Sequence, residues 1–258
     1  MTAAEILLGL LNALHPHPGA ASLLVHCGKA LGLSVNQVRV GLSRLTRSGR
    51  IRRNDDGYRL TARAASRWSL LGGWRDRLDR LVAWDGGWWV ALSGHRPRSD
   101  RKAARRRRSA LQRLGFETFR DGLDLRPANL DLDRQMLATI LSDLHFDGDL
   151  LTVQDAPWGD DVLRALWAPD DRSGLYHQET QRLRDSLRTL PTDADAVAAA
   201  FFTGHRGQQV ALHAPLIPTE WLAPGCRQDF WAALDDYDRA GRALWDAFFT
   251  GLHGDDAP

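Results

Sequence analysis

Three predicted helices followed by a hairpin occupy the first 61 residues, and this order restricts the fold more than any other feature of the chain. Residues 2–5 (Thr-Ala-Ala-Glu) and 34–37 (Ser-Val-Asn-Gln) are capping boxes, each of which marks the first turn of a helix. An apolar helix is predicted between them, over 21–30, after a turn with two prolines. The Asn-Asp-Asp-Gly turn at 54–57 separates two strand-like runs and predicts an antiparallel hairpin, because Asx residues and glycine tolerate positive φ.

The third predicted helix, residues 34–47, has an outward face suited to the major groove of DNA. On a helical wheel the apolar positions 35, 38, 42 and 45 share one face, and Val40 lies among polar residues on the opposite face. Arg can pair with guanine, Asn or Gln with adenine, and an exposed Val can touch a thymine methyl group. An ordinary amphipathic helix shows the same pattern, but the Gly-containing turn before it and the basic hairpin after it favour a winged helix-turn-helix that binds DNA. The predicted DNA-binding residues are Ser34, Asn36, Gln37, Arg39, Val40, Ser43, Arg44, Arg47, Arg52, Arg53, Tyr58 and Arg59.

Contacts to DNA bases and contacts to phosphates are expected to be divided between the helix and the hairpin. Arg39 and Arg44 on the helix are expected to read bases, whereas Arg52 and Arg59 on the hairpin are expected to contact phosphates. The charge distribution supports a polyanionic partner for this end of the chain. Residues 1–120 hold 23 Lys and Arg against 8 Asp and Glu, whereas residues 121–258 hold 11 against 24, so the net charge of +2 conceals a strong asymmetry.

The rest of the chain predicts an α+β fold in which a central ferredoxin-like α/β domain precedes a helical C-terminal domain. Alternating strand and helix patterns over 83–155 follow a β-α-β-β-α-β order. From Trp158 onward helical patterns dominate. The expected domains are a winged helix-turn-helix at 1–62, a linker helix at 63–82, the ferredoxin-like domain at 83–155 and the helical domain at 156–258.

A run of arginines on the first helix of the central domain is the densest charge in the sequence. It is compatible with a solvated surface, with auxiliary phosphate contacts to DNA, or with a site for an anionic effector, and the run itself does not decide among them. Two tryptophans precede it in the chain and could supply aromatic surface. The candidate effector-binding residues are Arg101, Arg105, Arg106, Arg108, Trp88 and Trp89.

No pattern indicates catalysis, a cofactor or a metal. The HExxH, GxSxG, Walker and GxGxxG motifs are absent, so an enzyme is not expected. Cys27 and Cys226 are too far apart for a zinc spacing, and both are expected to be core thiols. The apolar runs are too short to span a bilayer, and the N-terminus has no positively charged region of a signal peptide, so a cytoplasmic location is expected.

Three stretches of the chain resemble the PaaX family, repressors of phenylacetate catabolism. Residues 33–61, which end in Gly-Tyr-Arg-Leu-Thr, are similar to the family's winged module. Residues 84–86 (Trp-Asp-Gly), the arginine run, 114–116 (Leu-Gly-Phe) and 122–123 (Gly-Leu) are similar to its central domain. Residues 214–218 (Ala-Pro-Leu-Ile-Pro), 221–225 (Trp-Leu-Ala-Pro-Gly) and 230–237 are similar to its C-terminal segment. Two departures are clear, since residues 122–127 lack the family's tryptophan and Ala214 stands where the family has an aspartate.

The resemblance implies a homodimeric repressor of an aromatic-acid catabolic operon. It implies binding to double-stranded operator DNA, relieved by a small anionic effector such as an aromatic acyl-coenzyme A. The alternative is an interaction module whose basic N-terminal part binds RNA or an acidic protein surface. The chain shows no aromatic RNA-binding strand motif, so the DNA hypothesis is favoured.

Overall fold

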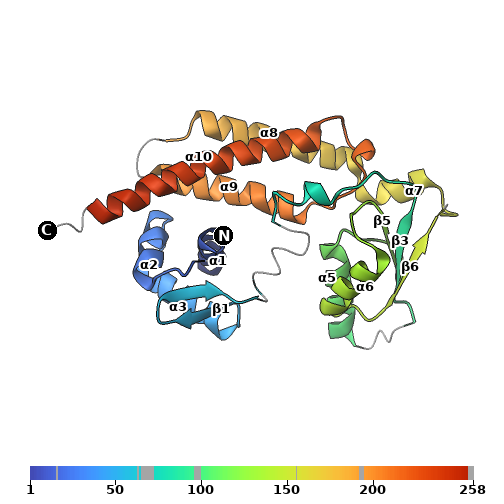
Figure 1. Cartoon of the computed structure of the whole chain (residues 1–258), viewed down its shortest axis with the longest axis horizontal. Helices are drawn as coiled ribbons and strands as arrows, with labels where there is room; N and C mark the ends of the chain where they lie inside the picture. The colour runs from blue at the N-terminus through green and yellow to red at the C-terminus, as the bar shows by residue number, and fades with distance from the viewer. Residues whose placement is uncertain are drawn as a thin grey trace. The chain divides into compact units, whose positions relative to one another are not determined.

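The computed structural model describes residues 1–15, 17–62, 64, 73–95, 100–154, 156–191 and 195–254. The chain divides into two compact units, and each is formed by separate stretches of sequence (Figure 1). The first unit contains Met1–Gly72, Gln181–Gln209 and Ala233–Pro258, and the second contains Gly73–Thr180 and Val210–Ala232. Three long helices contribute residues to both units: α8 (Pro169–Arg188), α9 (Asp195–His213) and α10 (Cys226–Gly254).

The first unit begins with helices α1 (Ala3–Leu14), α2 (Ala21–Ala30) and α3 (Val35–Arg47), as the sequence predicts. Both capping boxes are present. The Ser34 hydroxyl accepts a hydrogen bond from the Gln37 backbone N–H at 3.2 Å, and the Gln37 side-chain oxygen accepts one from the Ser34 N–H at 2.8 Å. The equivalent bonds of Thr2 and Glu5 measure 3.3 and 2.7 Å. These reciprocal bonds satisfy backbone donors at the start of each helix and so fix where it begins.

The core of the first unit joins the three N-terminal helices to parts of α9 and α10. Leu7, Leu24 and Val38 are fully buried at its centre. Aromatic side chains from the long helices, among them Phe201 and Trp245, pack against this core. The N-terminal helices and hairpin are therefore part of a larger hydrophobic core within their unit.

Strands β1 (Ile51–Asn54) and β2 (Gly57–Leu60) form the predicted hairpin, with Ile51 opposite Leu60. Gly19, between α1 and α2, extends this sheet, because its N–H donates to the Tyr58 carbonyl at 2.8 Å and its carbonyl accepts from the Tyr58 N–H at 2.9 Å. Gly57 has φ of 133°, and a Cβ there would lie 2.5 Å from the Gly19 carbonyl oxygen. A glycine is required at 57 for both reasons.

Gly57→Ala is expected to lower the free energy of unfolding by about 3 kcal/mol, because an L side chain at this φ is strained and its Cβ meets backbone that cannot rotate away. Urea denaturation followed by circular dichroism measures the loss. Gly49→Ala is the matched control, since Gly49 has φ of 68° but a Cβ at that position would meet no atom within 4 Å. It should cost only about 1 kcal/mol. Equal losses in the two variants would contradict the contact with Gly19.

The second unit contains a four-stranded antiparallel sheet with the strand order β4-β5-β3-β6. Along the chain its elements are β3 (Trp88–Leu92), α5 (Arg101–Arg113), β4 (Glu117–Arg120), β5 (Leu123–Pro127), α6 (Arg134–Asp143) and β6 (Asp149–Val153), which is the predicted β-α-β-β-α-β order. Helices α5 and α6 lie on the same side of the sheet (Figure 1). The α+β class is confirmed.

The short elements of the second unit are η1 (Leu78–Arg80), α7 (Asp160–Arg164), η2 (Ala165–Trp167) and η3 (Thr219–Trp221). Four tryptophans from different segments pack together here, and Trp88 of β3 lies within 6 Å, centroid to centroid, of Trp84, Trp167 and Trp221. The Trp167 indole N–H donates to the Gly115 carbonyl at 3.0 Å. This cluster joins the C-terminal segments to the central strand of the sheet.

The compact units divide the chain differently from the expected domains. Segment 156–258, expected to be one helical domain, supplies helices to both units. Of the expected linker helix at 63–82, residues 63 and 65–72 lie outside the described residues. In the described remainder, Ala64 is helical and residues 78–80 form the short η1 helix. None of the described helices is long and apolar enough to cross a membrane.

Candidate nucleic-acid interface

Helix α3 presents a polar face to solvent. Its apolar residues Val38, Leu42 and Leu45 are buried together with Gly41, where an added Cβ would lie 2.6 Å from the side chain of Leu7 in α1. This close approach of α1 fixes which side of α3 faces outward. All seven predicted DNA-binding residues within α3 are exposed: Asn36, Gln37, Arg39, Val40, Ser43, Arg44 and Arg47.

Val40 is the unusual member of this face, because 40% of a large apolar side chain is left in solvent. Helical spacing puts Asn36, Ser43 and Arg47 around it at the centre of the exposed face. Arg39 and Arg44 lie on opposite flanks of this centre. The exposed face therefore offers amide, hydroxyl, guanidinium and methyl groups, the types that contact base edges.

A cleft of about 730 Å³ lies between the exposed face of α3, the start of α2 and the hairpin. Its apolar lining includes Ala21, Val25 and Val35. Val35 is predicted to lie on the buried face of α3, but because it faces this cleft it is only half-buried. Arginines from two elements, Arg39 and Arg47 of α3 and Arg53 of β1, line the same cleft together with Ser22, Ser43 and Tyr58. Arg44 and Arg52 do not line it.

Most arginines of this surface have no acidic partner among the described residues. Arg39, Arg44, Arg47, Arg52 and Arg53 form no ion pair with any described residue. Arg53 lies instead over the ring of Tyr58, with its guanidinium carbon 5.9 Å from the ring centroid.

Arg59 differs from the other arginines of the hairpin. Its guanidinium donates to the Asp56 carboxylate at 2.7 Å, and this hydrogen bond holds the pKa of Asp56 below its usual value. Its charge is therefore partly neutralised within the hairpin, a contact that sequence analysis missed. Because Asp56 lies only three residues away in the turn, the i,i+3 spacing could have indicated it.

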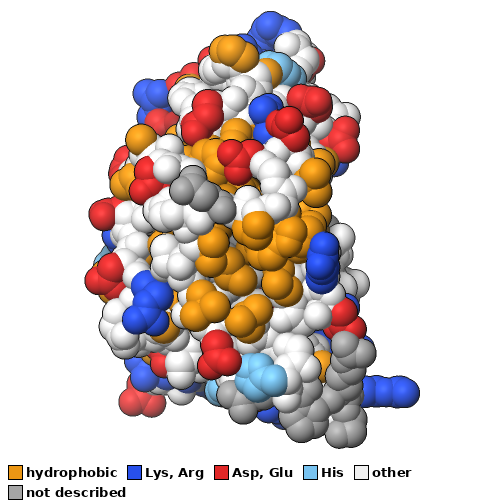
Figure 2. Space-filling view, turned by 90° about the vertical axis from the view of Figure 1, so that its right-hand side faces the viewer, with side chains coloured by type: hydrophobic (Ala, Val, Ile, Leu, Met, Phe, Trp, Pro, Cys, Tyr) orange, Lys and Arg blue, Asp and Glu red, His pale blue; other side chains and the backbone are white. Residues whose placement is uncertain are grey.

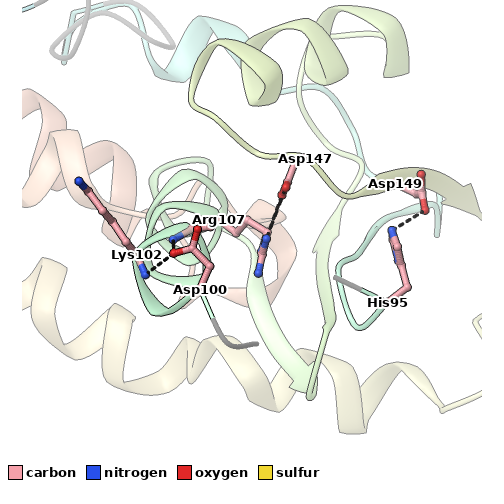
Figure 3. A network of polar contacts seen from close by, with 7 residues as sticks. His95, Asp100, Lys102, Arg107, Asp147 and Asp149 are labelled. Atoms are coloured by element: carbon pink, nitrogen blue, oxygen red, sulfur yellow. Dashed lines mark hydrogen bonds and ion pairs between the residues drawn. The ribbon is translucent and has the colours of Figure 1, made fainter. Parts of the chain in front are cut away.

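The arginine run on α5 is divided between the surface and the interior. Arg107 is buried and donates to Asp147 at 3.2 Å, and Asp100 caps the helix by accepting from the Lys102 and Ala103 N–H groups (Figure 3). A second contact in the same view joins His95 to Asp149 at 3.6 Å. The other basic side chains of the run are exposed and form no ion pair with a described residue: Arg101, Lys102, Arg105, Arg106 and Arg108.

The two tryptophans of the candidate effector site are not surface residues. Trp88 and Trp89 are 0% and 4% exposed, since they lie on a central strand that is covered on both faces. Trp88 belongs to the tryptophan cluster, and the Trp89 ring lies 5.4 Å from the guanidinium of Arg126. The structure therefore does not bring these rings together with the exposed arginines of α5.

A buried polar cluster in the second unit was not anticipated from the sequence. It binds the extended segment 214–217, here named the strap, through its main-chain carbonyls. Arg77 donates to the carbonyl of Ala214 at 2.8 Å, Arg126 to that of Leu216 at 3.2 Å and Arg227 to that of Ile217 at 2.8 Å. The Asn129 side chain also donates to Leu216, at 3.0 Å. Because Pro215 and Pro218 have no N–H, the strap cannot pair as a regular strand, and these side chains satisfy its carbonyls instead.

Comparisons with known proteins support the resemblance found in the sequence. The family model described as "PaaX-like protein" matches residues 2–64. A solved structure, that of the uncharacterized protein Rv0674 from Mycobacterium tuberculosis, is similar to this chain with 26% sequence identity and a TM-score of 0.59. The similarity covers 93% of this chain and 99% of that one. No curated protein matches the chain. Among the described residues, no three His, Cys, Asp or Glu side chains gather as a metal site would require.

Proposed function

We propose that this chain, whose residues 2–64 match the PaaX-like family model, is a transcriptional regulator that binds double-stranded DNA. The family is regulatory rather than enzymatic. The observation that carries the proposal is the combination of an exposed α3 face with arginines that lack acidic partners in the described part of the chain. Elsewhere in the first unit, Arg188 is paired with Asp185 and Arg242 with Asp238. A surface that leaves cations unpaired is suited to a phosphate backbone.

The geometry suggests how contacts would be divided. Asn36, Val40 and Arg47, at the centre of the exposed face, are the proposed base-reading residues. Arg39, expected from the sequence to read bases, lines the cleft between α3 and the hairpin together with Arg53. Both are therefore proposed to hold the phosphates of one strand, with the backbone lying along the cleft. Arg44 on the opposite flank remains a candidate base reader, as do Ser34 and Gln37 at the helix start, while Arg52 remains a candidate phosphate contact. Arg59 is expected to contribute less than Arg52 because it is paired with Asp56.

The experiment that tests this function is selection from a random double-stranded DNA pool, followed by fluorescence anisotropy with the enriched duplex. The chain should bind that duplex at least about 1000-fold more tightly than a scrambled duplex. Single-stranded RNA of the same length is the second probe. Tighter binding to RNA, or no enrichment of any duplex, would contradict the proposal and favour the alternative interaction module.

The remaining parts of the proposal are a homodimer and an anionic effector. A single recognition helix reads only a few base pairs, so two copies on a near-palindromic operator would double the site. Apolar side chains gather on the face of the second unit seen in Figure 2, the kind of surface that a second copy could cover. Leu151 of β6 and Val162 of α7 are 45% and 57% exposed in this unit. Repression of an aromatic-acid operon, relieved by an aromatic acyl-coenzyme A, is the role that the family resemblance supports.

The full chain is expected to sediment as a dimer at micromolar concentration. The full chain is needed for this test. A fragment of residues 84–258 would lack the N-terminal helices that share a core with Phe201 of α9 and Trp245 of α10. Analytical ultracentrifugation over a hundredfold range of protein concentration measures the association. A sedimentation coefficient of a monomer throughout that range would refute the dimer while leaving DNA binding by the winged module open.

A further inference from the structure

Two arginines that contact the strap are buried without an acidic partner among the described residues. Arg77 and Arg126 are 6% and 1% exposed, and neither forms an ion pair with any described residue. Arg126 donates to the carbonyls of Leu114, Pro127 and Leu216 and to the side-chain oxygen of Asn129. Arg77 donates to the carbonyl of Ala214, and its Nε atom is buried with no hydrogen-bond partner. All of these acceptors, from the described residues, are neutral.

The electrostatic field in this region is positive. Burial lowers the pKa of Arg77 to about 10 and that of Arg126 to about 9, and the charge of Arg77 contributes to the second shift. Both guanidinium groups therefore remain charged at neutral pH. Burial, then the charges of Arg77 and Arg113, also lower the pKa of His213, the residue just before the strap. Buried charges in proteins are normally paired, because neutral carbonyls replace only part of the hydration that a guanidinium loses.

Ala214 is the strap residue that contacts Arg77. Its carbonyl is the acceptor for Arg77, and its own side chain is a methyl group. The strap, Ala-Pro-Leu-Ile, therefore supplies no carboxylate to pair with Arg77 or Arg126.

We propose that Arg77 and Arg126 form a binding site for a small carboxylate ligand. When no anion is bound, the two guanidinium groups donate instead to the carbonyls of Ala214 and Leu216. A guanidinium binds a carboxylate through two parallel charge-assisted hydrogen bonds, which are about twice as strong as bonds to a neutral carbonyl. The unpartnered Nε of Arg77 is a donor that such a ligand would satisfy. The ring of Trp89 beside Arg126 offers an apolar wall for the organic part of the ligand.

Occupation of this site would act on the long helices at the ends of the strap. Helix α9 ends at His213, and α10 begins at Cys226 after the strap and η3. Both helices continue from the second unit into the first, where Phe201 and Trp245 pack against the core of the winged module. If the proposed DNA-binding function holds, the carboxylate is an effector and the strap is the element that it moves; the binding site itself does not depend on that function.

The test measures carboxylate binding in the full chain without DNA, so that its outcome is separate from that of DNA binding. Sodium benzoate is the probe, and sodium chloride at equal ionic strength is the control for general salt effects. Benzoate should raise the Tm of the wild-type chain in a saturable way, by roughly 5 to 10 °C at a hundredfold excess over its Kd. Isothermal titration calorimetry should report one site per chain. No saturable difference between benzoate and chloride would overturn the proposal.

Ala214→Asp and Ala214→Asn form the matched pair of variants. The aspartate supplies a carboxylate beside Arg77, so this variant should have a higher Tm than the asparagine variant and should no longer respond to benzoate. Ala214→Asn is nearly the same size but neutral, and it should still respond. A lower Tm for Ala214→Asp than for Ala214→Asn, or equal benzoate responses, would overturn the assignment.

A third variant keeps the test decisive if Ala214→Asp does not fold. Arg77→Gln retains an N–H donor for the carbonyl of Ala214 but carries no charge, and it should bind benzoate at least about tenfold more weakly, the effect of losing one charge-assisted bond. Arg105→Gln, on the exposed face of α5, removes the same charge elsewhere in the unit and should bind benzoate as the wild type does. Wild-type affinity in Arg77→Gln would place the benzoate site elsewhere and refute the proposal.

Discussion

Changing Arg39, Arg47 and Arg53 together to alanine is expected to weaken binding to the selected duplex about 1000-fold at physiological salt. The three guanidinium groups line one cleft, and none of them forms an ion pair with a described residue. Their charge is therefore available to phosphates and bases. Each phosphate contact that is lost should also reduce the slope of log K against log salt by about one. Anisotropy titrations at several salt concentrations measure both quantities.

The matched control for this variant is Arg188, Arg239 and Arg242 changed together to alanine. It alters the net charge of the chain by the same amount, but these arginines are paired with aspartates on α8 and α10. The control should bind the duplex within about threefold of the wild type, because exposed paired charges contribute little to a distant interface. If the two triple variants lose affinity equally, the effect is one of net charge, and the cleft is not the DNA contact.

Arg126→Met is expected to lower the free energy of unfolding of the second unit by about 4 kcal/mol. Methionine fills much of the space but leaves the buried carbonyls of Leu114 and Pro127 and the side-chain oxygen of Asn129 without this donor. Each buried acceptor left unsatisfied costs about 1 to 3 kcal/mol. The carbonyl of Leu216 keeps its bond from Asn129, so the strap should loosen rather than be released completely.

Urea denaturation monitored by tryptophan fluorescence measures this loss, because the tryptophan cluster and Trp89 lie in the same unit. Arg105→Met is the control, since Arg105 is exposed on α5 and should change stability by no more than about 0.5 kcal/mol. A midpoint for Arg126→Met equal to that of the control would show that the strap is held by its apolar contacts, and that the hydrogen bonds of Arg126 add nothing measurable.

Local patterns predicted the N-terminal module well because each of them acts over a few residues. Ser34 and Gln37 cap α3 within a single turn, and the Asx-Gly turn at 54–57 closes the hairpin through the conformations its own residues prefer. The exposed side of α3 follows from helical periodicity. The sequence of strands and helices in the second unit was predicted on the same basis, since periods of 2 and 3.6 residues distinguish the two.

The burial and the contacts of individual side chains in the second unit could not be predicted from local patterns. Within a uniform run of arginines, Arg107 turns inward to Asp147, 40 positions away, while its neighbours face solvent. Trp88 and Trp89 appeared available for a ligand, but both are buried: Trp88 packs against Trp167 and Trp221, and Trp89 packs against Arg126. In each case the deciding contact comes from a distant part of the chain.

The sequence by itself determined the α+β class, the three helices and hairpin at the N-terminus and the residues that α3 exposes, because caps, turns and periodicity are local properties of the chain. Only the tertiary structure decided that α8, α9 and α10 are shared between two units. The same is true of the hydrogen bonds that Arg77, Arg126 and Arg227 donate to the carbonyls of the strap. Arg126 and Leu216 are 90 positions apart, and no local pattern in the sequence relates them. An arginine in an isolated sequence predicts an exposed charge, since its burial depends entirely on acceptors that folding brings to it.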